Sequence, residues 1–164
     1  MNADGTVKSN VKIANSTNGG PTLADGDFFG SSVATLEDLD GDGVNELAVG
    51  AIRANSGLGA VYVLLMNSNG TAKSSVTIGS GLNGGPTLSG STYFGRGMAS
   101  LGDFDGDGVA DLAVGGSNDS TGGTQRGAVY VLLLNANGTV KSNVKIASGT
   151  NGGPTLANAD FFGT

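Results

Sequence analysis

The sequence predicts an all-β protein made of four-stranded antiparallel sheets, which are arranged as the blades of a β-propeller. Three observations carry this prediction: segments recur at intervals of 65 and 68 residues, 31 of the 164 residues are glycine, and no segment shows sustained helical periodicity. Glycine at this level without a collagen triplet period is typical of all-β repeats with many tight turns. A β-solenoid is the alternative for a repeated chain, but its repeats are usually much shorter.

The repeats are clearest in a Lys-Ser-x-Val-x-Ile motif. It occupies residues 8–13, 73–78 and 141–146, which gives spacings of 65 and then 68 residues. The motifs Gly-Gly-Pro-Thr-Leu and aromatic-Phe-Gly recur with the same spacings. The three extra residues of the second interval fall between Gly115 and Gly127, so we expect a length-tolerant loop there.

Each complete repeat divides into four short strands. In the first one we expect strands at about 28–36, 46–51, 59–66 and 71–78. The apolar runs in the second and third of these strands predict burial on both faces of the sheet. An Asn-Gly pair between the third and fourth strands predicts a tight hairpin. Four antiparallel strands in a unit of this size describe a propeller blade.

The repeat spacing predicts two full blades with partial blades at both ends. Residues 1–27 are expected to form a partial blade (an outer strand and a connecting loop), 28–92 and 93–159 the full blades, and 160–164 the start of a further blade. Propellers close their ring with about four to eight blades. Three arrangements are therefore open: part of a longer repeat protein, which we favour, a head-to-tail assembly of three or four copies, or an open stack with exposed end strands.

Each full repeat carries a glycine-rich acidic loop between its first and second strands. Carboxylates stand at positions 1, 3, 5 and 9 of the loop, and position 7 would add a backbone carbonyl. Calcium takes six to eight oxygen ligands with flexible geometry, so this set suits calcium better than magnesium. The predicted ligands of two Ca²⁺ sites are Asp38, Asp40, Asp42, Val44 and Glu46 in the first loop, and Asp103, Asp105, Asp107, Val109 and Asp111 in the second.

Position 12 distinguishes these loops from an EF-hand. An EF-hand has a bidentate Glu there and is flanked by helices. The residues at this position are Val49 and Val114, inside segments that predict strands. The alternative without metal, a solvated acidic turn, is disfavoured because two copies share the same spacing.

Composition excludes several classes of function. The net charge of −6 argues against nucleic acid and anionic membranes as partners, and no apolar run is long enough for a transmembrane helix. The chain has no Cys and no His, which excludes thiol chemistry and removes the usual general base. No nucleophile–base pair is visible, and the loop carboxylates are assigned to metal, so we do not expect an enzyme.

The two full repeats resemble the FG-GAP repeats of integrin α-subunit β-propellers and their bacterial relatives. Phe29-Gly30 with Ala48-Val49-Gly50-Ala51 carries the resemblance in the first repeat, and Phe94-Gly95 with Ala113-Val114-Gly115-Gly116 carries it in the second. The resemblance covers essentially the whole chain. In one departure, the Pro of the Gly-Ala-Pro element is replaced by Ile52 or Ser117.

The resemblance implies calcium in the acidic loops on one rim of the propeller and ligand binding on the opposite rim. The loops on that opposite rim would be residues 52–58, residues 117–126 and the Asn-Gly-Gly-Pro-Thr-Leu segments. The expected partners are a protein or glycan ligand there, and further copies of the chain in a head-to-tail oligomer that completes a propeller. Nucleic acid and membrane insertion are not expected.

We therefore expect a calcium-binding repeat module for extracellular adhesion or protein interaction, in which calcium is structural rather than catalytic. Extracellular modules often bind calcium weakly, at about 10⁻⁴ to 10⁻³ M, so such sites fill outside the cell and stay largely empty in cytosol. This predicts an extracellular or cell-surface location, with no signal peptide visible in this chain. The alternatives are a purely structural repeat and an accessory domain of a larger secreted hydrolase or lyase.

Overall fold

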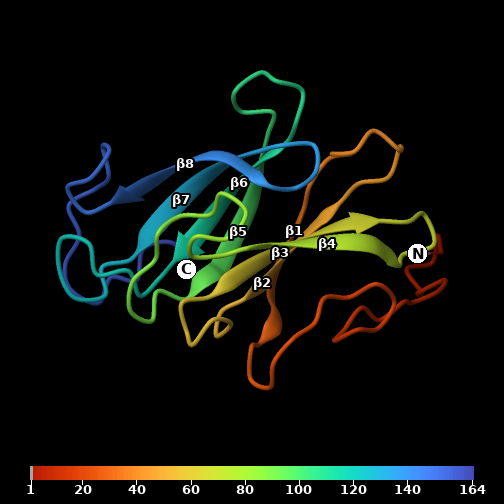
Figure 1. Ribbon diagram of the computed structural model, residues 1–164, viewed down its shortest axis with the longest axis horizontal. Helices are drawn as coiled ribbons and strands as arrows, with labels where there is room; N and C mark the ends of the chain where they lie inside the picture. Colours follow the sequence, from red (N-terminus) through yellow and green to blue (C-terminus); the bar gives the residue numbers. More distant parts are fainter. Residues whose placement is uncertain (1) are drawn as a thin grey trace.

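Two four-stranded antiparallel sheets, joined in sequence, make up the protein (Figure 1). The structure is a computed structural model that describes residues 2–164. The first sheet, here the first blade, contains β1 (Phe29–Thr35), β2 (Leu47–Ala51), β3 (Ala60–Met66) and β4 (Ala72–Ile78); the second blade contains β5 (Phe94–Gly102), β6 (Asp111–Gly116), β7 (Ala128–Leu134) and β8 (Val140–Ala147). Each sheet keeps its strands in sequence order, which confirms the predicted propeller-blade architecture.

The strands form where the apolar pattern predicts them. The four strands expected in the first repeat begin and end within one residue of β1 to β4. Val61 and Val63 on one face of β3 are fully buried, and Tyr62 on the other face is 6% exposed, so this inner strand is covered on both faces. The predicted hairpin is present: the Gly70 backbone N donates to the Asn67 carbonyl at 2.9 Å. No helix able to span a membrane occurs among residues 2–164.

The second blade packs on the first through β5, which contacts β1, β2 and β3. The Phe94 backbone N donates to the Leu58 carbonyl at 3.0 Å, and the Phe94 ring meets Tyr130 of its own blade edge to face, with centroids 5.3 Å apart. A Cβ added at Gly50 would lie 2.1 Å from the Gly95 carbonyl oxygen, so glycine is what lets the two backbones approach. One apolar core runs across this junction.

The same junction begins again after the second blade. The Phe162 backbone N donates to the Arg126 carbonyl at 2.9 Å, and a Cβ added at Gly115 would lie 1.7 Å from the Gly163 carbonyl oxygen. Residues 160–164 therefore dock on the second blade as the start of β5 docks on the first. This contact agrees with the expected start of a further blade, while the predicted domain boundaries themselves stay a prediction.

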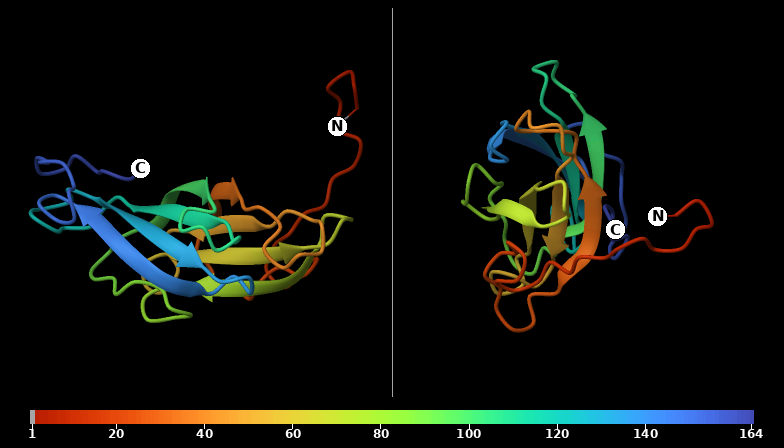
Figure 2. Two further views of the ribbon diagram at one scale, coloured as in Figure 1. Left: turned by 90° about the horizontal axis from the view of Figure 1, so that it is seen from above. Right: turned by 90° about the vertical axis from the view of Figure 1, so that its right-hand side faces the viewer.

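The outer strand expected within residues 1–27 does not form. Met1 lies outside the described residues, and residues 2–27 contain no named strand. Val7 and Val11 are 65% and 42% exposed, because no third strand lies beside this segment among the described residues to provide a ladder of hydrogen bonds. Instead the start of the chain leads away from the sheets (Figure 2), while Val11 and Ile13 line a groove on the first blade. The turn that follows contacts this blade where the Ala72 backbone N donates to the Asn18 carbonyl at 2.9 Å.

Candidate metal centres

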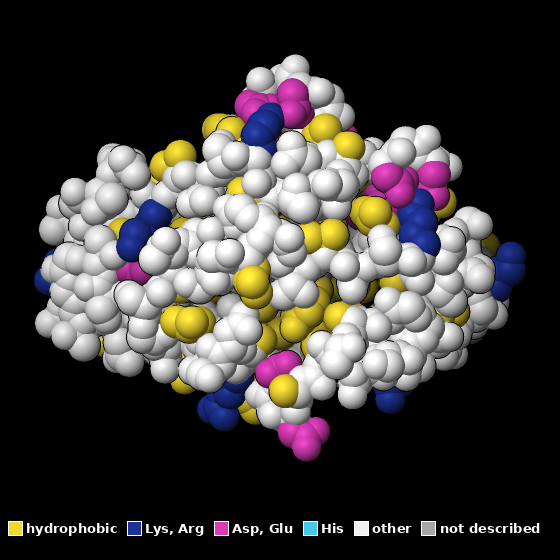
Figure 3. Space-filling model, viewed as in Figure 1, with side chains coloured by type: hydrophobic (Ala, Val, Ile, Leu, Met, Phe, Trp, Pro, Cys, Tyr) yellow, Lys and Arg dark blue, Asp and Glu magenta, His cyan; other side chains and the backbone are white. Residues whose placement is uncertain are grey.

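Both acidic loops lie at the same end of their blades, beside the hairpins that join the third and fourth strands. The loop between β1 and β2 spans residues 36–46, and the loop between β5 and β6 spans 103–110. Because neighbouring strands are antiparallel, these loops and the hairpins 67–71 and 135–139 share one rim. At the top and the upper right of Figure 3, two separate groups of acidic side chains each have a basic group against them.

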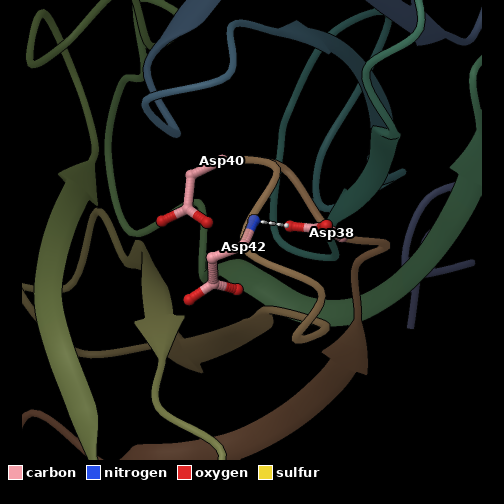
Figure 4. Close-up of side chains that lie close together, drawn as sticks. All are labelled: Asp38, Asp40 and Asp42. Atoms are coloured by element: carbon pink, nitrogen blue, oxygen red, sulfur yellow. Dashed lines mark hydrogen bonds between the residues drawn. The ribbon is translucent and has the colours of Figure 1, made fainter.

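Three predicted ligands converge in the first loop. Asp38, Asp40 and Asp42 each offer a carboxylate oxygen, and these oxygens lie within 4.8 Å of one another (Figure 4). The Asp38 carboxylate accepts hydrogen bonds from the backbone N of Gly41 at 2.8 Å, of Asp42 at 3.0 Å and of Gly43 at 2.8 Å. Both glycines have a positive φ, of 80° and 86°, which the tight wrapping of the loop requires.

The second loop repeats this wrapping with a different trio. The Asp103 carboxylate accepts from the backbone N of Gly106 at 2.7 Å, of Asp107 at 2.9 Å and of Gly108 at 2.9 Å. The converging carboxylates are those of Asp103, Asp105 and Asp111. Asp107 stands outside this trio, so the two loops offer related but not identical donor sets.

The carboxylate at position nine is fully buried in both blades. Glu46 accepts from the Leu39 backbone N at 2.9 Å and from the Met66 backbone N at 3.2 Å. It therefore ties the start of its loop to the end of β3, and it stands outside the first trio. Asp111 does the same with the backbone N of Phe104 (3.0 Å) and Leu134 (2.9 Å). Their role as metal ligands stays a prediction, and their structural role was not foreseen from the sequence.

A lysine from the fourth strand contacts each loop, which sequence analysis missed. The Lys73 Nζ lies 2.7 Å from Asp40 Oδ2 and also donates to Asp42 Oδ2. The hydrogen bond from Lys73, together with one from the Val44 backbone N, holds the pKa of Asp42 below its ordinary value. The recurrence of lysine at positions 8, 73 and 141 was the signal that could have identified this contact.

Lys141 makes the matching contacts in the second loop. Its Nζ lies 2.6 Å from Asp105 Oδ2 and donates to Asp107 Oδ2. The hydrogen bond from Lys141, followed by one from the Val109 backbone N, lowers the pKa of Asp107. The carbonyl oxygens of Val44 and Val109 stay predicted ligands.

The chemistry of these donors fits a hard divalent cation. Every side-chain donor in the two trios is a carboxylate oxygen, and oxygen donors suit magnesium, calcium and manganese rather than the softer metals that prefer sulfur or imidazole. The loop glycines and the backbone hydrogen bonds to Asp38 and Asp103 hold the wrapped conformation that brings these oxygens together. The arrangement can therefore hold a cation without a large rearrangement of the backbone.

The rim opposite the acidic loops holds the longer loop of the second blade, residues 117–126. Asp119 there is 4% exposed and accepts from the Tyr130 hydroxyl at 2.8 Å and the Lys145 Nζ at 3.3 Å. Burial acts to raise the pKa of Asp119, but hydrogen bonds from Thr121 and Tyr130 outweigh it and lower this pKa. Arg126 also donates to Asn158 Oδ1 at 3.1 Å, so the loop predicted to be length-tolerant is fastened at several points.

Three aromatic residues on this opposite rim have left-handed backbone conformations. Phe28, Tyr93 and Phe161 have φ values of 58°, 55° and 52° and occupy the same position in successive repeats. Such values are rare for bulky residues. Phe28 is 53% and Phe161 37% exposed, and the Arg53 guanidinium lies 4.8 Å from the centre of the Phe28 ring. Tyr93 and Phe161 line a groove that also includes Asn118.

Comparison with known proteins matches the repeats to a family. The FG-GAP repeat matches residues 29–64 and 94–132. Integrin alpha-PS2 of Drosophila melanogaster is 36% identical over 114 residues, which cover 65% of this chain and 8% of that protein. Integrin alpha-PS5 of the same organism is 34% identical over 126 residues (77% and 12%), and integrin alpha-3 of Mus musculus is 34% identical over 141 residues (83% and 12%). The chain thus spans 8% to 12% of the length of these relatives.

Proposed function

Because the chain belongs to the FG-GAP repeat family, we propose that it is a calcium-binding propeller module for extracellular adhesion or protein interaction. One observation carries the calcium proposal: in each acidic loop three carboxylates offer oxygens that lie within 4.8 Å of one another. The two loops occupy matching places in the two blades. The integrin relatives support an adhesion or interaction type of propeller. An extracellular or cell-surface location follows if the sites belong to the weak class that fills only outside the cell.

The calcium sites would stabilise the rim of each blade. Asp38, Asp40, Asp42, the Val44 carbonyl and Glu46 would hold the ion in the first loop, and the matching residues from Asp103 to Asp111 would hold it in the second. Calcium, when bound, supplies the positive charge that offsets the repulsion between these carboxylates. An ion that binds the folded state alone raises the free energy of unfolding by mass action.

Partner binding is proposed for the opposite rim. The three left-handed aromatic residues support this. A strained backbone conformation costs about 1–3 kcal/mol, so it persists only where the surrounding structure enforces it, and such conformations are concentrated at functional sites. Exposed aromatic rings beside arginine suit a protein or glycan ligand. Head-to-tail association of copies is a second proposal for partners, supported by the recurrence of one junction geometry at Gly50 and Gly115.

Thermal unfolding with and without calcium tests the proposed function. At calcium concentrations 100 times the dissociation constant, each site adds about 2.7 kcal/mol, which corresponds to a rise in melting temperature of roughly 5–10 °C per site for a domain of this size. Replacing one ligand in each loop, in an Asp40→Asn/Asp105→Asn double variant, should remove most of this rise.

The matched control is Asp25→Asn, which makes the same change of charge at an exposed aspartate outside both loops and should keep the full rise. Equal melting temperatures of the unsubstituted chain with calcium and with chelator would contradict the proposal. So would a double variant that keeps the whole calcium-dependent rise.

A further inference from the structure

The strand-four lysines contact the same carboxylates that would hold calcium. Lys73 lies against Asp40 and Asp42, and Lys141 against Asp105 and Asp107. The lysine side chains are 27% and 35% exposed, so each ammonium lies at the edge of its loop with solvent beside it. Two blades with different loop sequences repeat this arrangement, which makes it a property of the repeat.

The buried carboxylate at position nine of each loop fixes the point from which the lysine strand begins. Glu46 accepts from the Met66 backbone N at the end of β3. Met66 pairs with Ala72 across the hairpin, and Lys73 follows directly. One contact therefore fixes the end of the acidic loop, the hairpin and the start of β4 in the same corner of the blade.

The second blade builds the corner in the same way. Asp111 accepts from the Leu134 backbone N at 2.9 Å, and Leu134 pairs with Val140, the residue before Lys141. The lysine thus reaches the third and fifth positions of its loop in both blades because its strand begins at an anchored point.

An ammonium group and a divalent ion make opposing demands on these oxygens. The ammonium supplies one positive charge to two aspartates, which reduces their mutual repulsion. A divalent ion bound to the same oxygens would repel the ammonium at short range. The lysine must then leave the aspartates, and its exposed, flexible side chain can turn into solvent.

We propose that Lys73 and Lys141 are positioning residues that hold the acidic loops in their wrapped conformation without calcium and are displaced when calcium binds. At each loop one calcium ion replaces one lysine ammonium. The need to displace the ammonium weakens calcium binding, while in the empty loop the ammonium reduces the repulsion between the carboxylates. The inference rests on the calcium sites of the proposed function.

Calorimetric titration of the full chain with calcium chloride tests this exchange. A Lys73→Met/Lys141→Met double variant keeps an unbranched apolar side chain that is one atom shorter at both positions and removes both charges. Because exposed ion pairs of this kind are weak, we expect calcium to bind up to about fivefold more tightly at each site. In excess chelator the same variant should melt at a lower temperature than the unsubstituted chain. Its loops have lost the lysine ammonium groups that offset the repulsion between their carboxylates.

Two controls separate charge at the loop from other effects. Lys73→Arg/Lys141→Arg keeps the positive charge and should bind calcium within about twofold of the unsubstituted chain. Lys12→Met makes the same change at an exposed lysine outside both loops and should leave the affinity unchanged.

The outcomes distinguish this inference from the proposed function. Unchanged or weaker calcium binding by the methionine double variant would overturn the exchange, while binding by the unsubstituted chain would leave the calcium sites standing. Binding by the double variant alone would overturn both proposals for the natural sequence, because calcium would then not displace its lysines. If neither protein binds calcium, both proposals are wrong.

Discussion

Replacing Gly50 by alanine is expected to disrupt the junction between the two blades. The added Cβ would lie 2.1 Å from the Gly95 carbonyl oxygen and 2.5 Å from the Ser32 Oγ, so the second blade must move away. Ser32 Oγ donates to this same carbonyl at 2.5 Å, and that hydrogen bond would be lost. Overpacking of this kind costs about 1–3 kcal/mol or more, equal to a fall in melting temperature of roughly 2–12 °C for this size of domain.

Circular dichroism in the presence of calcium measures this fall. Gly97→Ala is the matched control, because Gly97 also lies in a strand and its added Cβ would meet nothing nearer than 3.1 Å, in the terminal residue Thr164. Gly50 has no positive φ, so alanine adds no backbone strain there, and the effect measures the close approach together with the lost Ser32 hydrogen bond. Equal melting temperatures for the two variants would show that the blades do not meet at Gly50.

Replacing Glu46 by alanine is expected to destabilise the chain even without calcium. The side chain is fully buried, and its removal leaves the backbone N–H groups of Leu39 and Met66 without an acceptor. An unsatisfied buried donor costs about 1–3 kcal/mol, so we expect a loss of about 2–6 kcal/mol in the free energy of unfolding. Urea denaturation in excess chelator measures this loss apart from any effect on metal binding.

The control for this substitution is Glu37→Ala, at an exposed glutamate nine residues earlier in the chain. It should change the free energy of unfolding by less than about 0.5 kcal/mol, as is usual for surface positions. If Glu46→Ala is no more destabilising than Glu37→Ala in chelator, Glu46 does not tie the loop to β3, and its burial would need another explanation.

The sequence predicted the strands well because each inner strand is an apolar run between turn residues. Burial of such a run needs neighbours on both faces, and this requirement leads directly to stacked sheets. The outer strand at residues 8–13 failed for a physical reason that local sequence does not contain. Its motif closely matches residues 141–146, which form part of β8. Only the later copy lies beside a third strand, so tertiary context decides which of the two becomes a strand.

The candidate sites could be predicted as loops but not in their internal geometry. Position nine is carboxylate in both loops, yet Asp111 joins the converging trio and Glu46 does not. The recurrence of Lys73 and Lys141 marked them as part of the repeat, but their contact with the loops depends on the hairpin between the third and fourth strands. Likewise, the left-handed backbone of Phe28 and Tyr93 is a property of the fold, and the aromatic repeat alone did not reveal it.

The number of calcium ions bound per chain is the most direct test of the central claim that both acidic loops are calcium sites. Equilibrium dialysis against calcium at concentrations well above the dissociation constant measures this number. The unsubstituted chain should bind two ions, Asp40→Asn or Asp105→Asn alone should bind one, and the double variant should bind none. An unsubstituted chain that binds no calcium, or a double variant that still binds two ions, would contradict the claim.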